Sequence, residues 1–136
     1  MEQRLNVVTL VVTDLDDSRR FYRDALGWRP LIDVPGEVLM FEVGTKLVLS
    51  LWAEERAVDE IGPVVRGGTA PVTLAHNCGS PEDVDRVLED ARAAGAQVQP
   101  GVRRDWGGYS GYFADPDGFR WEVAHAPEGV GGLTFP

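Results

Sequence analysis

One carboxylate and one phenol near the end of the chain are the side chains best suited to chemistry. Glu122 lies in the middle of a stretch that alternates apolar and polar residues, and Tyr112 lies in the preceding stretch. A carboxylate at mid-strand is costly unless it faces solvent, a partner or a metal. Three roles stay open for Glu122: contact with a ligand, a structural pair with Arg120, or acid–base catalysis with Tyr112 as the acid. Glu122 and Tyr112 are therefore the candidate catalytic residues.

A turn between these two stretches is expected to place them side by side. The sequence Asp115-Pro116-Asp117-Gly118 favours a tight turn, because proline presets the first central φ angle and glycine tolerates the position that follows. Alternating residues flank the turn on both sides. The pattern predicts a β-hairpin with strands at 109–114 and 119–124.

The two halves of the chain repeat the same order of elements. Each half begins with an apolar strand, continues with a capped amphipathic helix after Asp14 or Ser80, and ends in three strands. Val8-Thr9-Leu10 aligns with Val72-Thr73-Leu74, and 41–52 aligns with 113–124 without a gap, so that Ser50 takes the place of Glu122. The predicted strands are 5–12, 28–34, 38–43, 46–52, 71–76, 97–102, 109–114 and 119–124.

This repeat predicts an α+β fold in a single domain covering 1–136. A first βαβββ module is expected at 1–53, a linker at 54–68, a second module at 69–126 and a C-terminal tail at 127–136. Neither module closes its own sheet, so two curved mixed sheets are expected to pack and form a cleft. A ferredoxin-like or other α+β fold is the alternative.

Several of these motifs resemble the vicinal oxygen chelate superfamily, which includes glyoxalase I, extradiol dioxygenases, and fosfomycin and bleomycin resistance proteins. The resemblance covers nearly the whole chain and implies the glyoxalase/bleomycin resistance fold. It leaves the function open, because the superfamily hosts several chemistries on one scaffold. The residues that carry the resemblance are Thr13-Asp14-Leu15, Phe21-Tyr22, Ala25-Leu26-Gly27-Trp28, Asp115-Pro116-Asp117-Gly118 and Trp121-Glu122.

The resemblance also implies where a divalent metal would be held. Such a metal needs three or four oxygen or nitrogen ligands. Of the implied positions, Val7 has no donor atom, Pro71 offers only its backbone carbonyl, and the Ser50 hydroxyl is a poor neutral ligand. We therefore predict no metal and no cofactor. His76 and His125 are out of phase with the implied positions, although a bulge would bring either one inward. The implied positions are Val7, Ser50, Pro71 and Glu122.

Alternation along the strands predicts a ligand-binding surface of aromatic, aliphatic and a few polar side chains. In the fosfomycin resistance proteins, the residues that match Thr9 and Tyr112 help to hold the substrate. The glycine-rich segment 105–112 suggests that Trp106 stacks on a flat ligand; the alternative is that Trp106 and Tyr109 pack on their own hairpin. The predicted ligand-binding residues are Thr9, Val48, Ser50, Trp52, Trp106, Tyr109, Tyr112, Arg120 and Glu122.

Composition narrows the class of partner. A net charge of −9 over 136 residues argues against nucleic acid, which needs clustered Lys and Arg. The single cysteine, Cys78, excludes an intrachain disulfide. No apolar run reaches the length of a membrane span, and no signal-peptide pattern is present, so the expected location is the cytoplasm without membrane association.

These observations favour a metal-free protein that binds a small molecule, and that sequesters or carries an aromatic or cationic compound. The first alternative is an enzyme of the same superfamily: a metal-dependent lyase, isomerase or dioxygenase with non-standard ligands, or an acid–base catalyst that uses Glu122. A second alternative is a subunit with a vestigial cleft whose role is association with another protein. Superfamily members of this size commonly form homodimers, which is the assembly expected here.

Overall fold

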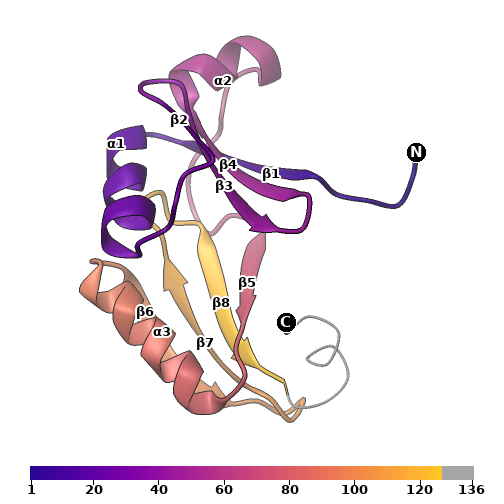
Figure 1. The fold of residues 1–136 in the computed structure, drawn as a ribbon, viewed down its shortest axis with the longest axis vertical. Helices are drawn as coiled ribbons and strands as arrows, with labels where there is room; N and C mark the ends of the chain where they lie inside the picture. Colours follow the sequence, from indigo (N-terminus) through magenta and orange to yellow (C-terminus); the bar gives the residue numbers. More distant parts are fainter. Residues whose placement is uncertain (127–136) are drawn as a thin grey trace. The chain divides into compact units, whose positions relative to one another are not determined.

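The computed structural model describes residues 1–126 of the chain, and it divides into two compact units at Met1–Arg66 and Gly67–Pro136. Each unit contains one four-stranded sheet and its own helices (Figure 1). The predicted α+β fold of two βαβββ modules is confirmed, and the boundary between the units falls within the segment predicted to be a linker.

The first unit contains a mixed sheet with strand order β1-β4-β3-β2. Strand β1 runs parallel to β4, and the other neighbours are antiparallel. The elements in chain order are β1 (Val7–Val12), α1 (Leu15–Ser18), the π-helix η1 (Arg19–Ala25), β2 (Ile32–Val34), β3 (Val38–Gly44), β4 (Leu47–Ala53) and α2 (Glu54–Ile61).

The second unit repeats this topology with strand order β5-β8-β7-β6. Strand β5 is parallel to β8, and β8-β7-β6 is antiparallel. Helix α3 lies across this sheet (Figure 1). The elements are β5 (Thr73–Asn77), α3 (Pro81–Ala93), β6 (Gln97–Arg103), β7 (Tyr109–Ala114) and β8 (Arg120–His125).

The predicted helix starts are confirmed by their caps. The Asp14 carboxylate accepts hydrogen bonds from the backbone N–H groups of Asp16 (2.8 Å) and Asp17 (3.2 Å). The Ser80 hydroxyl accepts one from Asp83 (3.1 Å), and Pro81 occupies the first helical position. Both caps satisfy N–H groups that have no partner within the helix.

Several segments differ from their predictions, and the strand predicted at 5–12 starts at Val7. The strand predicted at 28–34 is formed only at Ile32–Val34, since the Trp28 N–H bonds the Tyr22 carbonyl and Pro30 has no N–H to give to a sheet. The segment predicted as a linker, 54–68, begins with α2, whose buried Ala57 packs against the first sheet. The strand predicted at 71–76 starts instead at Thr73.

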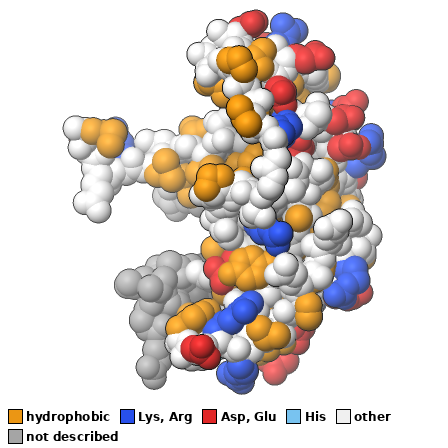
Figure 2. Space-filling view, turned by 180° about the vertical axis from the view of Figure 1, so that it is seen from behind, with side chains coloured by type: hydrophobic (Ala, Val, Ile, Leu, Met, Phe, Trp, Pro, Cys, Tyr) orange, Lys and Arg blue, Asp and Glu red, His pale blue; other side chains and the backbone are white. Residues whose placement is uncertain are grey.

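Each sheet has one face turned toward helices of its own unit. In the first unit this face contributes the fully buried Leu39, Phe41, Leu49 and Leu51, with Phe21 and Tyr22 of η1 packed among them. Hydrophobic side chains also reach the surface of the first unit (Figure 2). They include Val7 (48% exposed), Ile32 (43%) and Val34 (38%).

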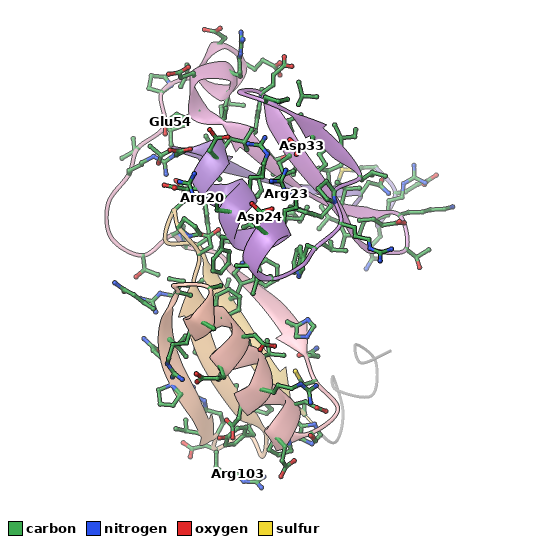
Figure 3. The ribbon with its side chains drawn as sticks, turned by 60° about the vertical axis from the view of Figure 1, so that its left-hand side comes forward. Arg20, Arg23, Asp24, Asp33, Glu54 and Arg103 are labelled. Carbon is green, nitrogen blue, oxygen red and sulfur yellow. The ribbon has the colours of Figure 1, made fainter. Side chains whose placement is uncertain are left out.

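An ion-pair network joins η1 to the edge strand β2. The buried Arg19 donates to both carboxylate oxygens of Asp33 (3.1 Å each from Nε and 2.6 Å from Nη2), and Arg23 reaches the same carboxylate at 3.3 Å. Arg23 also pairs with Asp24, and Figure 3 labels Arg23, Asp24 and Asp33 beside η1. The hydrogen bond from Arg19 is the main reason that the pKa of Asp33 is lowered.

Among the described residues, no helix is long and apolar enough to cross a membrane.

Candidate functional site

The hairpin turn that precedes Glu122 is held by one buried carboxylate. An oxygen of Asp115 (6% exposed) accepts hydrogen bonds from the backbone N–H groups of Asp117 (3.0 Å) and Phe119 (2.9 Å). The Asp115 N–H donates to the Phe119 carbonyl (3.0 Å), and Gly118 adopts φ = 86°, which glycine tolerates best. The turn fixes the register of β7 against β8.

That register places Tyr112 directly opposite Glu122, and Phe113 opposite Trp121. Because neighbouring residues of a strand point to opposite faces, the two pairs lie on different sides of the sheet. The Phe113 and Trp121 rings stack at 5.9 Å and are buried on the side of α3. Tyr112 and Glu122 therefore lie on the face that α3 does not cover, which we call the open face.

Tyr112 and Glu122 are joined by a hydrogen bond. The phenol donates to the Oε1 atom of Glu122 at 3.0 Å, and both side chains are half-buried. Burial, followed by this hydrogen bond, raises the pKa of Tyr112 above its usual value. The phenol therefore stays protonated at neutral pH and holds the carboxylate in place as a donor.

Arg104 lies beside the Tyr112–Glu122 pair, and these three side chains form a cluster. Its Nε donates to the hydroxyl of Ser110 (3.0 Å), and its Nη2 donates to the Ser110 carbonyl (3.1 Å). The Arg104 guanidinium also lies 5.8 Å from the centre of the Tyr112 ring, within cation–π range. Because Ser110 is on the open face and only 1% exposed, these bonds anchor Arg104 over that face.

Arg120 adds a second guanidinium to the same face. Arg120 lies on β8, two residues before Glu122. It pairs in register with Thr73 on β5 and with Ala114 on β7. Two residues along a strand correspond to about 7 Å. The open face of the second unit thus brings together three of the predicted ligand-binding residues, Tyr112, Arg120 and Glu122.

Four other predicted ligand-binding residues share one face of the first unit. Thr9 pairs with Ser50, Val48 pairs with Val7, and Trp52 pairs with Val11, so all lie on the side opposite to the buried Leu49 and Leu51. Ser50 is 3% exposed, whereas Thr9 is exposed and Trp52 is half-buried. Their role in binding stays a prediction.

Tyr109 and Trp106 are placed differently from this set. Tyr109 lies on the α3 side, where its hydroxyl donates to Asp85 of α3 at 2.8 Å and its ring covers Gly101. The indole of Trp106 lies over Gly108, where a Cβ atom would meet the ring at 1.7 Å, and it remains 57% exposed. Both aromatic rings thus pack on their own hairpin, and a role for either one in ligand binding stays a prediction.

The positions implied for a metal do not form a suitable ligand set. Val7 pairs with Val48, two residues before Ser50, and Thr73 pairs with Arg120, two residues before Glu122. Thr73 therefore occupies the place equivalent to Val7, and Pro71 lies outside β5. A valine, two hydroxyl groups and one carboxylate do not fit a catalytic divalent ion.

The histidines do not add ligands to this set. His76 pairs with Val123 and so lies on the α3 side, and His125 contacts the Cys78 carbonyl through Nδ1 at 3.0 Å. Within residues 1–126, no group of three or more His, Cys, Asp or Glu side chains is arranged to hold a metal ion. Burial raises the pKa of the Cys78 thiol, which disfavours a reactive thiolate there.

Arg104 is the one member of the cluster that the sequence did not single out. It lies just beyond β6, after a register irregularity between Gln99 and Val102, so alternation along the strand could not assign its side chain to a face. The available signal was the pair Arg103-Arg104 at the start of the glycine-rich segment.

Comparisons with known proteins agree with this architecture. A model of the Glyoxalase/Bleomycin resistance protein/Dioxygenase superfamily matches residues 4–123. A solved structure of a glyoxalase-related enzyme from Fulvimarina pelagi is 35% identical over 93% of this chain and 90% of that chain, with a TM-score of 0.83. A lactoylglutathione lyase structure from Agrobacterium tumefaciens is 26% identical over 92% and 95% of the two chains, with a TM-score of 0.70.

A fosfomycin resistance protein structure from Mesorhizobium loti is 19% identical over 98% of this chain and 100% of that chain, with a TM-score of 0.70, and supports the fold alone. No curated protein matches the sequence. The family match spans both units and includes the hairpin that carries Glu122. The chain belongs to the Glyoxalase/Bleomycin resistance protein/Dioxygenase superfamily.

Proposed function

We propose that this protein binds a small aromatic molecule on the open face of the second unit, without a metal, and that it sequesters or carries this molecule unchanged. The observation that carries the proposal is the state of Glu122. One carboxylate oxygen, Oε1, is held by Tyr112, and no residue within 1–126 bonds the other. No buried side-chain oxygen lacks a partner in that range, so Oε2 is accessible.

A fixed carboxylate with one free oxygen is suited to orient a ligand. Oε2 can accept a hydrogen bond from a hydroxyl or amine of the ligand, and the Tyr112 bond keeps the carboxylate from reorienting. The neighbouring Tyr112 ring offers apolar surface beside this polar contact. A few placed polar groups on a largely apolar surface are typical of small-molecule sites.

The donor chemistry favours binding over the metal-dependent reactions of the superfamily. In such a reaction a cation would polarise oxygen atoms of the substrate, and it needs three or four protein ligands. Here Glu122 is the one conventional ligand among the four equivalent positions. The affinity of the proposed site would come instead from apolar burial and from hydrogen bonds.

An acid–base enzyme is the second candidate, because the Tyr112–Glu122 pair itself favours it. A carboxylate 3.0 Å from a phenol could accept a proton from a bound substrate through Oε2. The two candidates differ in the fate of the ligand: a binding protein returns it unchanged, whereas an enzyme returns a product.

Binding of β-naphthylmethanol, a flat neutral probe with one hydroxyl donor, tests the proposal. We expect one-to-one binding by calorimetry, the same affinity after dialysis against EDTA, and unchanged probe by mass spectrometry. Glu122→Gln should weaken binding, because an amide oxygen is a poorer acceptor than a carboxylate. Glu82→Gln, on the exposed first turn of α3, should have no effect.

Two outcomes would contradict the proposal. Loss of binding after metal removal, restored by a divalent ion, would favour the metal-dependent alternative. Equal binding by the parent protein and Glu122→Gln would place the ligand elsewhere. The homodimer and the cytoplasmic location stay predictions; sedimentation of the purified protein measures the first.

A further inference from the structure

The guanidinium of Arg120, on the open face, is a charged group without a partner among the described residues. No hydrogen bond or ion pair joins it to any residue within 1–126, although it is half-buried against the sheet. Its neighbours in register, Thr73 and Ala114, carry no charge. By contrast, Arg86 and Arg92 of α3 pair with Asp83 and Glu89 of their own helix.

Arg104 is only partly satisfied. Its Nε and Nη2 donate to Ser110, whereas Nη1 has no acceptor within 1–126. Since no buried side-chain nitrogen in this range lacks a partner, Nη1 is accessible. The open face therefore offers two guanidinium groups with free N–H donors, held on the two sides of Tyr112 and Glu122.

Within residues 1–126, the charged side chains that lie on the open face include two arginines and one glutamate, whereas the whole chain is acidic. The chain carries a net charge of −9, but the acidic side chains of the second unit lie largely on α3, which packs on the other face of the sheet. Among residues 1–126, strand register assigns Glu122 and Arg120 to the open face, and Arg104 lies over the same face. The acidic side chains of α3 are Glu82, Asp83, Asp85, Glu89 and Asp90.

We propose that the ligand of the open face is an aromatic anion, whose carboxylate or similar oxyanion is bound by Arg120. This inference rests on the proposed binding function and replaces the cationic ligand considered from the sequence. A guanidinium presents paired N–H donors that match the two oxygens of a carboxylate. A cationic ligand would meet two like charges at this face.

The geometry also limits the shape of the ligand. Arg120 and Glu122 are two residues apart on one strand, which is about 7 Å. A molecule with an anionic group at one end and a hydroxyl or amine donor at the other spans that distance with one aromatic ring between them. Hydroxy- and amino-substituted aromatic acids with the two groups at opposite ends of the ring have this arrangement.

Three naphthalene probes with the same ring system and an anionic, a neutral or a cationic group test the inference: β-naphthoate, β-naphthylmethanol and β-naphthylmethylamine. Calorimetry at low and high salt should rank the anion first and the cation last, with the anion favoured by about tenfold or more, since hydrogen bonds between charged groups are the strong ones. Added salt should weaken binding of the anion more than binding of the alcohol.

Variants of Arg120 test whether this residue causes the preference for the anionic probe. Arg120→Gln should remove most of the preference for the anion, and Arg120→Lys should keep part of it, because lysine retains the charge but not the paired donors. Arg103→Gln is the matched control: Arg103 pairs in register with Tyr109 and so lies on the α3 side. Figure 3 shows it at the lower end of the second unit. Circular dichroism verifies that each variant is folded.

The outcomes separate this inference from the function on which it rests. If the alcohol binds at Glu122 and the anion binds no better, or if Arg120→Gln leaves the preference intact, the anionic ligand is refuted and the binding function stands. If the cation ranks first, the charge argument is reversed. If no probe binds, the binding function itself fails.

Discussion

The hydrogen bond between Tyr112 and Glu122 can be measured by a double-mutant cycle of Tyr112→Phe and Glu122→Gln. The donor and acceptor are 3.0 Å apart, and the acceptor is charged. Hydrogen bonds to charged groups contribute roughly 1.5–3 kcal/mol, and partial exposure to water places this one somewhat below that range. We expect Tyr112→Phe to lower the free energy of unfolding by about 1 kcal/mol, because a phenyl ring keeps the packing and loses the donor.

The second variant separates charge from geometry. Glutamine keeps an acceptor oxygen, so Glu122→Gln should remove about half of the bond, given that charge-assisted hydrogen bonds are roughly twice as strong as neutral ones. The cycle should then report a coupling of about 0.5 kcal/mol. Urea unfolding followed by tryptophan fluorescence measures both. Tyr109→Phe is the control, since its hydroxyl bonds Asp85 near the surface of α3 and contributes less.

The pH dependence gives an independent test of the same bond. Because the pKa of Tyr112 is raised in the folded protein, mainly by burial, its contribution to stability is complete below the unfolded value of about 10 and is lost as pH rises through the folded value. Spectrophotometric titration should show the Tyr112 phenol ionising at a higher pH than an ordinary tyrosine. Glu122→Gln should lower this pKa only part of the way toward the ordinary value, because burial remains. Additive variants, or a normal pKa for Tyr112, would refute the geometry on which the proposed site depends.

Two further predictions concern the elements that position the site. Asp115→Ala should lower the free energy of unfolding by about 2–3 kcal/mol, because the Asp117 and Phe119 N–H groups lose a buried acceptor. Asp115→Asn keeps an acceptor oxygen and should lower it less. Urea unfolding measures both variants, and equal losses would contradict the acceptor role. Asp33 has a lowered pKa through its bond to Arg19, so its contribution is present above the unfolded value and is lost as pH falls through the folded one. Asp33→Asn should therefore lower the free energy of unfolding at neutral pH and make it fall less steeply below about pH 4. If the variant loses stability in acid as steeply as the parent protein, the Arg19–Asp33 pair contributes nothing.

Local patterns were sufficient for most of the architecture. The caps at Asp14 and Ser80 and the hairpin at 115–118 were predicted because each depends on residues only a few positions apart. The alignment of 41–52 with 113–124 is confirmed in space, since Met40 pairs with Ser50 as Tyr112 pairs with Glu122. A tight hairpin transmits its register along both strands, so a gapless alignment holds there.

The same alignment was wrong by two residues for the first strand of each unit. Thr9 was matched with Thr73, but Thr9 pairs with Ser50 whereas Thr73 pairs with Arg120. Strands β1 and β5 join their sheets through parallel pairs after long connections, so no turn fixes their register. A shift of two residues keeps every side chain on its face, and alternation therefore cannot detect it.

The sequence by itself determined the superfamily, the two βαβββ modules, and the presence of one carboxylate where a metal site would need several ligands. The modules follow from local periodicity and turns, whereas the superfamily and the expected ligand positions follow from the resemblance of the motifs. Only the tertiary structure decided which charged side chains lie on the open face. It placed Arg104 over Tyr112, left Arg120 without a partner within the described residues, and turned Tyr109 toward α3. Each of these depends on register across strands and on a bulge, which are set by packing between distant segments.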